Sequence, residues 1–384
     1  MLARRSLPLV LVAPLLLAAL ALASTALPPV AHGADDTTTA PRITSAAAGA
    51  TAWKLDRPVR VRVTGGTLSA VSLTGRDGRT VRGRMAPSRW TSTGRLVPRS
   101  TYVLEATAVA PDGQQTTLRE RLRTGKPEAV LSARISPDGY TVGVGRPVVV
   151  TFNHTVRRKA AVEKALSVTT SRDVGPAAWS WTSSRTVQFR PKGFWPANTR
   201  VSVTADLRKV RAGRGLWGMR DTKAAFKIGR SLVMRVSDAK HRMAVVKNGK
   251  RIRTFGVSMG KSGFTTRSGT KVIMDKHVSY RMRSTTVGIT GSEAYDLDVP
   301  YAMRITSSGE FLHGAPWNPY VGVANRSHGC TNLTLSAARW VFDRVREGDP
   351  VVTRGTGREM ESYNGLGGVW NVRWKAWRAG SALT

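Results

Sequence analysis

Cysteine is almost absent from this chain: among 384 residues the only thiol is Cys330. A single cysteine excludes an internal disulfide, and it cannot supply the several thiolate ligands of a cysteine-rich zinc site. It can act as a nucleophile, because a thiolate beside a basic group attacks carbonyl carbon readily. His328 and His313 both precede Cys330 closely in the sequence. The alternative is a purely structural role, with a buried cysteine and two histidines whose hydrogen bonds are made within the fold.

Acidic residues are also scarce: 24 Asp and Glu stand against 60 Lys and Arg, a formal net charge of +36. Inside a cell such an excess would indicate nucleic acid as a partner. The N-terminus favours export instead, because Arg4 and Arg5 precede an apolar run that ends in small residues, as in a secretory signal. We therefore expect residues 1–33 to be a signal peptide or a retained anchor, and no nucleic-acid partner.

Export places the expected location at the cell wall or the outer face of the cytoplasmic membrane. Membrane contact would then come only through the N-terminal segment, if it stays uncleaved. A basic surface in that location can bind anionic wall polymers through nonspecific electrostatics. The alternative is that the arginines reflect compositional bias and solubility alone. The charge thus predicts a location and no reaction.

The first half of the chain has the pattern of β-sandwiches. Residues 34–50 are poor in large apolar residues and predict a flexible linker. In residues 51–126, valines at 59, 61 and 63 alternate with arginines, the period of a half-buried strand. Residues 127–229 contain four further strand candidates (147–152, 186–190, 201–205, 224–228) and one short helix at 159–166. We predict two successive immunoglobulin-like modules that act as a spacer.

Residues 230–355 predict a mixed, β-rich domain. Strands are expected at 232–237, 243–247, 251–256, 272–274, 302–305, 311–312 and 349–353. Asn248-Gly249 predicts a tight hairpin turn. One clear helix is expected at 334–347, with Thr334 as its cap. Cys330 therefore lies in a loop that leads into a helix.

The C-terminal residues 356–384 contain three regularly spaced tryptophans, Trp370, Trp374 and Trp377. This spacing predicts one helical stripe, and we expect the segment to pack on the catalytic domain. The functional alternative is stacking on sugar rings.

Two features of the cysteine motif favour catalysis. Gly329 lets the backbone turn sharply and bring N–H groups near the sulfur, where they can stabilise an oxyanion. Ser327 can hold that turn through local hydrogen bonds.

The motif Ser327-His328-Gly329-Cys330-x-Asn332, preceded by His313-x-Ala-Pro-Trp, resembles the signature of the L,D-transpeptidases of bacterial peptidoglycan, which have a YkuD-like catalytic domain. The similarity extends over roughly residues 129–380. It includes residues 258–261, 301–305 and 365–371, and residues 142–148 and 194–196 of the second immunoglobulin-like module.

The resemblance implies a role for each residue of the motif. The implied catalytic set is Cys330 as nucleophile, His313 as base, Gly314 as the carbonyl that orients His313, His328 as a group near the thiolate, Gly329 with Cys330 as N–H donors of an oxyanion hole, and Tyr295 as a further hydroxyl donor. The implied substrate contacts are Asn332, Ser308, Gly309, Trp317 and Ser327. Asn332 has the alternative role of a turn residue, and Trp317 that of packing under a lid.

The implied reaction is a two-step acyl transfer without a metal or a cofactor. Cys330 attacks the carbonyl of the third residue of a tetrapeptide stem, D-alanine leaves, and the side-chain amine of a second stem resolves the thioester as a 3→3 cross-link. Carbapenems are expected to acylate the same thiol. Two alternatives remain open: an L,D-carboxypeptidase that uses water as acceptor, and a noncatalytic wall-binding protein.

Overall fold

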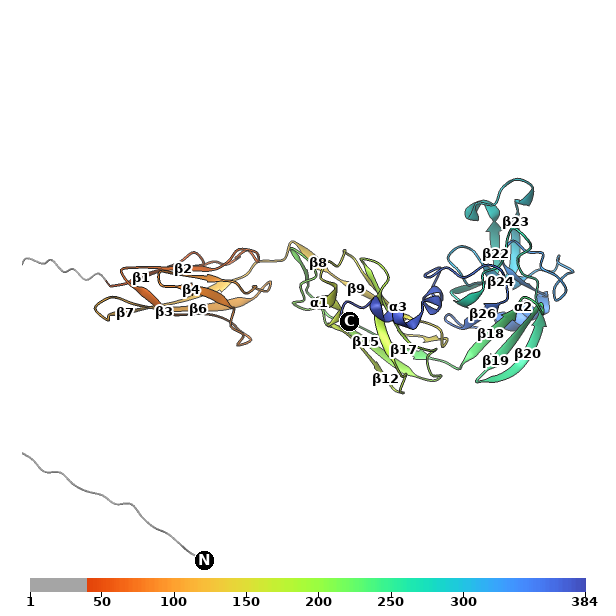
Figure 1. Cartoon of the computed structure of the whole chain (residues 1–384), viewed down its shortest axis with the longest axis horizontal. Coiled ribbons are helices and arrows are strands. Elements are labelled where there is room, and N and C mark those ends of the chain that lie inside the picture. The colour runs from red at the N-terminus through yellow and green to blue at the C-terminus, as the bar shows by residue number, and fades with distance from the viewer. Residues whose placement is uncertain (1–39) are drawn as a thin grey trace, which may run out of the picture.

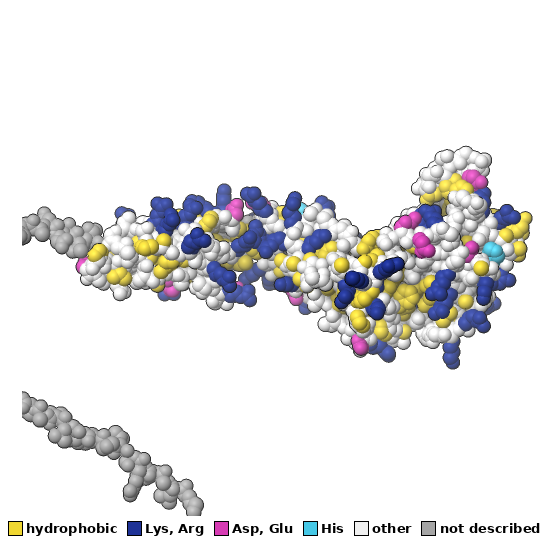
Figure 2. Space-filling view, viewed as in Figure 1, with side chains coloured by type: hydrophobic (Ala, Val, Ile, Leu, Met, Phe, Trp, Pro, Cys, Tyr) yellow, Lys and Arg dark blue, Asp and Glu magenta, His cyan; other side chains and the backbone are white. Residues whose placement is uncertain are grey.

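The computed structural model describes residues 40–384, so the expected signal peptide lies outside the described residues. Three β-rich units follow one another along the chain, and the C-terminal segment returns to the second unit (Figure 1). Figure 2 shows Lys and Arg side chains over the visible face of all three units, with few acidic ones among them. No helix among the described residues has the length and apolar character needed to cross a membrane.

The first unit is a sandwich of a four-stranded and a three-stranded sheet. Its strands are, in sheet order, β1 (Arg42–Ser45), β2 (Arg60–Thr64), β5 (Arg89–Ser92) and β4 (Gly83–Ala86), then β3 (Thr67–Gly75), β6 (Thr101–Val109) and β7 (Gln115–Arg123). The predicted linker at 34–50 is wrong from Arg42 onward. Strand β1 pairs with β2, and Ile43 packs against the sandwich core. This edge strand packs on the core through a single apolar side chain. Its composition therefore resembles that of a linker.

The second unit is a sandwich of two four-stranded sheets with a short parallel pair. Its strands are β10 (Thr141–Val142), β17 (Thr222–Ile228), β15 (Arg200–Ala205) and β12 (Leu166–Thr170), then β13 (Ala177–Trp181), β14 (Thr186–Pro191), β11 (Val148–Phe152) and β9 (Ala133–Ser136), then β16 (Leu216–Gly218) and β8 (Ala129–Leu131). The four predicted strands are confirmed. Helix α1 (Lys159–Glu163) is shorter than predicted.

The third unit contains two sheets, one with five and one with four strands. Their strands are β20 (Lys250–Gly256), β19 (Arg242–Lys247), β18 (Leu232–Ser237), β26 (Pro350–Arg354) and β21 (Gly269–Val272), then β22 (Asp275–Arg283), β23 (Asp296–Arg304), β24 (Phe311–Gly314) and β25 (Thr331–Leu333). The predicted hairpin is confirmed, because Asn248 and Gly249 both have positive φ and join β19 to β20. Strand β22 was not predicted, since most of its side chains are exposed.

Helix α2 (Leu335–Phe342) follows the cysteine loop and packs against β23 and β24. The Thr334 side chain accepts a hydrogen bond from the N–H of Ala337, which confirms the predicted cap. The helix ends five residues before the predicted Glu347. The buried carboxylate of Asp349 accepts the N–H of Arg346 at 2.8 Å and thereby turns the chain toward β26.

The C-terminal segment joins two units, and the prediction of one helical stripe is wrong. Trp370 lies in the 3-10 helix η3 (Gly368–Asn371), while Trp374 and Trp377 lie in α3 (Trp374–Ala379). All three rings surround the buried guanidinium of Arg190 on β14, with centroid distances of 4.9, 5.4 and 4.6 Å. Helix η3 contacts β21, whereas α3 packs on β13 of the second sandwich. The segment therefore packs on the catalytic domain, as predicted, and also on the second sandwich, which was not predicted.

Candidate active site

His313 and Cys330 meet on one face of the four-stranded sheet. Strands β24 and β25 are parallel, and their register places His313 beside Asn332. Side chains two positions apart point to the same face of an extended chain, so Cys330 faces the same way as Asn332 and His313. All three line one cavity of about 370 Å³. The fold thus brings together the two residues expected to act as nucleophile and base.

The imidazole of His313 is held in one orientation. Its Nδ1 lies 2.8 Å from the carbonyl oxygen of Gly314, the contact that the resemblance implies. A carbonyl can only accept, so Nδ1 carries the hydrogen and Nε2 keeps its lone pair. The Trp317 ring stacks on the imidazole with a centroid distance of 6.2 Å and is 51% exposed. Trp317 therefore covers His313 at the cavity rim.

Both members of the pair are neutral at rest. Burial lowers the pKa of His313 to about 4. Burial raises the pKa of the Cys330 thiol to about 12, although the backbone N–H of Phe311 opposes this shift. The Sγ donates to the carbonyl of Gly309 at 3.9 Å, and within residues 40–384 no hydrogen bond joins it to His313. The directions of both pKa shifts favour a neutral thiol beside a neutral imidazole over the expected thiolate.

The catalytic loop is braced by one hydroxyl group. Ser327 Oγ accepts the N–H of Gly329 at 3.1 Å and donates to the carbonyl of Cys330 at 2.6 Å. The N–H of Gly329 is thus occupied, which removes it from the expected oxyanion hole. The Cys330 N–H makes no hydrogen bond within the described residues. Burial raises the pKa of Tyr295, which lines the same cavity, to about 12, so its phenol keeps a proton to donate.

His328 lines the cavity that contains Cys330, and its ring also reaches the lid. The lid is the connection between β22 and β23, with the 3-10 helices η1 (Ser284–Val287) and η2 (Gly291–Glu293). His328 Nε2 lies 2.6 Å from a carboxylate oxygen of Glu293, and Lys261 Nζ lies 2.8 and 2.7 Å from the two oxygens. Hydrogen bonds from Lys261 and His328 lower the pKa of Glu293. We name Lys261, Glu293 and His328 the lid cluster.

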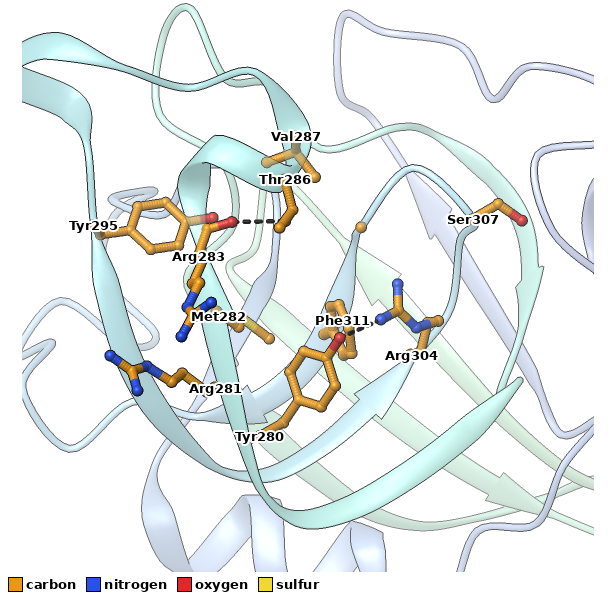
Figure 3. A pocket seen from close by; sticks show the side chains of 11 residues that line it. Tyr280, Arg281, Met282, Arg283, Thr286, Val287, Tyr295, Arg304, Ser307 and Phe311 are labelled. Atoms are coloured by element: carbon orange, nitrogen blue, oxygen red, sulfur yellow. Dashed lines mark hydrogen bonds between the residues drawn. The ribbon is translucent and has the colours of Figure 1, made fainter.

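A second cavity of about 470 Å³ shares Met282 and Tyr295 with the first, and Figure 3 shows the side chains that line it. Arg304 projects into it, donates to the Tyr280 hydroxyl at 2.8 Å and lies 4.3 Å from the centroid of the Phe311 ring. Gly309 lines this cavity as well. Cys330 lines the first cavity and not the second, which comes near the sulfur through Gly309, the residue whose carbonyl accepts from Sγ.

Ser308, an expected substrate contact, is held by the C-terminal segment. Its N–H donates to Asn364 Oδ1 at 3.1 Å, and its Oγ accepts from Asn364 Nδ2 at 2.8 Å. Ser308 lines neither of the two cavities described above. Ser308 instead lines a third cavity of about 400 Å³ together with Gly309 and Gly329.

A buried group of charges underlies the loop and was missed at the level of sequence. Lys271 Nζ lies 2.6 Å from one oxygen of Glu310, and Arg267 Nη1 donates to the other at 3.0 Å. Lys271 is fully buried and Glu310 is 3% exposed. We name Arg267, Lys271 and Glu310 the buried cluster. A lysine directly before the apolar run of residues 272–274 was its one sequence signal.

Metal ligands are not gathered in the described part of the chain: residues 40–384 contain no group of three or more His, Cys, Asp or Glu able to hold an ion.

These features are those of a cysteine acyltransferase domain that follows β-sandwich modules. A family model for the L,D-transpeptidase catalytic domain matches residues 232–353, and one for a bacterial Ig domain matches residues 50–211. L,D-transpeptidase 2 of Mycobacterium tuberculosis is 34% identical over 350 residues, 89% of this chain and 85% of that protein. The chain belongs to the L,D-transpeptidase family.

Other comparisons agree. L,D-transpeptidase 5 of Mycobacterium tuberculosis is 32% identical over 85% of this chain and 73% of that protein. A structure of the LD transpeptidase LdtMt1 in complex with imipenem covers 59% of this chain and 100% of its own, with 35% identity and a TM-score of 0.52. An L,D-transpeptidase from Mycobacterium smegmatis covers 59% and 99%, with 31% identity and a TM-score of 0.50.

Proposed function

We propose that the protein forms 3→3 cross-links in peptidoglycan by acyl transfer through Cys330. The observation that carries this proposal is the common cavity of His313 and Cys330, with Nε2 of the imidazole left free by the Gly314 carbonyl. A cysteine next to a histidine base that a third group orients is the arrangement used for nucleophilic acyl transfer. The reaction would begin from the neutral pair, because the thiol and the imidazole are both uncharged at rest.

In the first step Sγ attacks the carbonyl carbon of the third stem residue while its proton passes to Nε2 of His313. The oxyanion accepts hydrogen bonds from the Cys330 N–H and the Tyr295 hydroxyl, each worth about 3 kcal/mol. His313 then gives the proton to the amine of D-alanine, which leaves. A thioester remains on Cys330.

In the second step the side-chain amine of another stem attacks the thioester. His313 takes the proton of this amine, and the sulfur leaves and recovers a proton from His313. Asn332 can bind an N–H of either stem, because its buried Oδ1 has no hydrogen-bond partner within residues 40–384. The cavity of Cys330 and the second cavity, which borders Gly309 and shares Met282 and Tyr295 with the first, provide room for two stems, and this supports transpeptidation over hydrolysis.

The location and partners belong to the same proposal. A peptidoglycan substrate requires export to the cell wall or the outer face of the cytoplasmic membrane. The net charge of +36 supports binding to anionic wall polymers. Carbapenems are proposed inhibitors that acylate Cys330, since the relative LdtMt1 has been solved with imipenem.

The test is the incubation of purified protein with a defined tetrapeptide stem, followed by mass spectrometry. A cross-linked dimer with release of D-alanine is the expected product, and Cys330→Ser abolishes it. A trimmed tripeptide without dimer would identify a carboxypeptidase. No reaction, together with retained wall binding by Cys330→Ser, would identify a binding protein.

A further inference from the structure

A buried threonine contacts the catalytic loop from behind. Thr266 is 1% exposed and lies between β20 and β21. Its Oγ1 accepts the N–H of Gly260 at 2.8 Å and donates to the carbonyl oxygen of Gly329 at 2.8 Å. This hydroxyl group therefore has both of its strong hydrogen-bonding functions engaged, and one of them holds the residue before the nucleophile.

The carbonyl of Gly329 and the N–H of Cys330 belong to the same peptide group. The C=O and N–H of a trans peptide are planar and point in opposite directions. A hydrogen bond that fixes the carbonyl toward Thr266 therefore directs the Cys330 N–H away from it. That N–H has no partner within the described residues. Gly329 has φ +119° and no Cβ, so its own sterics do little to stop this peptide from rotating.

Thr266 is well placed to hold this peptide, because its segment is fastened to both sides of the nucleophile. Ser258 exchanges two backbone hydrogen bonds with Asn332, at 3.1 and 2.8 Å. The N–H of Lys261 donates to the carbonyl of Ser327 at 2.9 Å. A Cβ at Gly260 would lie 1.9 Å from a backbone oxygen, so the intervening turn is tightly packed. The threonine hydroxyl thus moves with the loop.

We propose that Thr266 is a positioning residue of the oxyanion hole: it orients the Gly329–Cys330 peptide so that the Cys330 N–H meets the oxyanion as Sγ attacks. The inference rests on the proposed function. It applies to every attack of Cys330 on a carbonyl, including the opening of a β-lactam ring. It does not apply to alkylation, in which the sulfur displaces iodide from carbon and no oxyanion forms.

The contrast between these two reactions provides the experiment. In the full chain carrying Thr266→Val, the rate constant for acylation by imipenem falls at least about tenfold, toward the hundredfold loss typical of a removed oxyanion donor. The rate constant for alkylation of Cys330 by iodoacetamide stays within about twofold of the wild-type value, because that reaction does not use the donor. Thr266→Ser restores acylation. Intact-protein mass spectrometry measures both rates.

Thr353→Val is the matched control. Thr353 is also buried, lies in β26, and its Oγ1 has no hydrogen-bond partner within residues 40–384. This variant keeps both rates. The proposal is overturned if Thr266→Val loses both rates equally or keeps its acylation rate. It is also overturned if Thr266→Ser does not restore acylation, or if Thr353→Val loses it. If Thr266→Val does not fold, the ratio of the acylation rate constant to the alkylation rate constant is measured on Thr266→Ala and tests the proposal in the same way.

The proposed function can fail separately. The proposed function is refuted if imipenem acylates the wild-type protein but the protein forms no cross-link. The comparison of acylation with alkylation still tests the role of Thr266 in that case.

Discussion

Two clusters of ionisable side chains lie next to the catalytic loop, and they are similar in composition but opposite in environment. Each places one carboxylate between two basic side chains. In the lid cluster the side chains of Lys261, Glu293 and His328 are 32, 40 and 24% exposed. In the buried cluster the side chains of Lys271 and Glu310 are 0 and 4% exposed. The two clusters differ most in solvent exposure, and exposure governs how much an ion pair stabilises a fold.

Exposed ion pairs contribute little to stability, because water and salt screen them. A buried pair is different, since loss of one partner leaves an uncompensated charge in a medium that solvates it poorly. We therefore assign the buried cluster to the support of the loop. The lid cluster is an attachment that can open, which a lid over a peptide-binding site requires.

The largest effect concerns the thiol that both clusters adjoin. If neither cluster ionises it, Cys330 keeps its proton until well above neutral pH. With a thiol pKa of about 12, the iodoacetamide rate constant rises about tenfold per pH unit between pH 7 and 10. Stopped alkylation followed by mass spectrometry measures this. A plateau between pH 6 and 8 would instead reveal an ion-paired thiolate.

The second prediction concerns the contribution of the buried cluster to the free energy of unfolding. Lys271→Met leaves a buried carboxylate with only one of its two basic partners, and we expect a loss of about 3–5 kcal/mol in the free energy of unfolding. Thermal unfolding of the catalytic domain measures it. Lys250→Met, at an exposed hairpin position, is the control and leaves the transition unchanged. A double variant that adds Glu310→Met should recover part of the loss, because it removes the orphaned charge as well.

The smallest effect concerns the lid. Glu293→Gln leaves thermal stability unchanged but slows acylation by imipenem about threefold, and the variant loses the salt dependence that screening of the lid cluster gives the wild type. Rates measured at low and high sodium chloride test this. Glu359→Gln, exposed and outside both clusters, keeps the wild-type behaviour. A salt response retained by Glu293→Gln would show that the cluster does not hold the lid.

Sequence reasoning identified the elements that local chemistry specifies. The Asn248-Gly249 turn needs positive φ at both positions, and few residues besides Asn and Gly adopt it readily. The motif around Cys330 and the cap at Thr334 are local in the same sense. The fold class followed from the alternation of apolar residues along short segments.

The rest depended on contacts that are remote in sequence. The end of α2 depends on Asp349, and the position of Ser308 depends on Asn364, more than fifty residues away. The protonation of the catalytic pair could not be predicted, because burial dominates both pKa shifts. Local hydrogen bonds of Ser327 were predicted, but the loss of the Gly329 N–H to one of them depends on the Ser327 rotamer.

The tryptophans around Arg190 have a mechanical consequence. The chain leaves the second sandwich near residue 229, forms the catalytic domain, and then contacts the sandwich again through α3. The two units are therefore connected at two places and not by a single linker. Trp370 reinforces this return by donating to the carbonyl of Gly145 at 2.7 Å. These two attachments together restrict rotation of the catalytic domain, and of the cavity that contains Cys330, relative to the second sandwich.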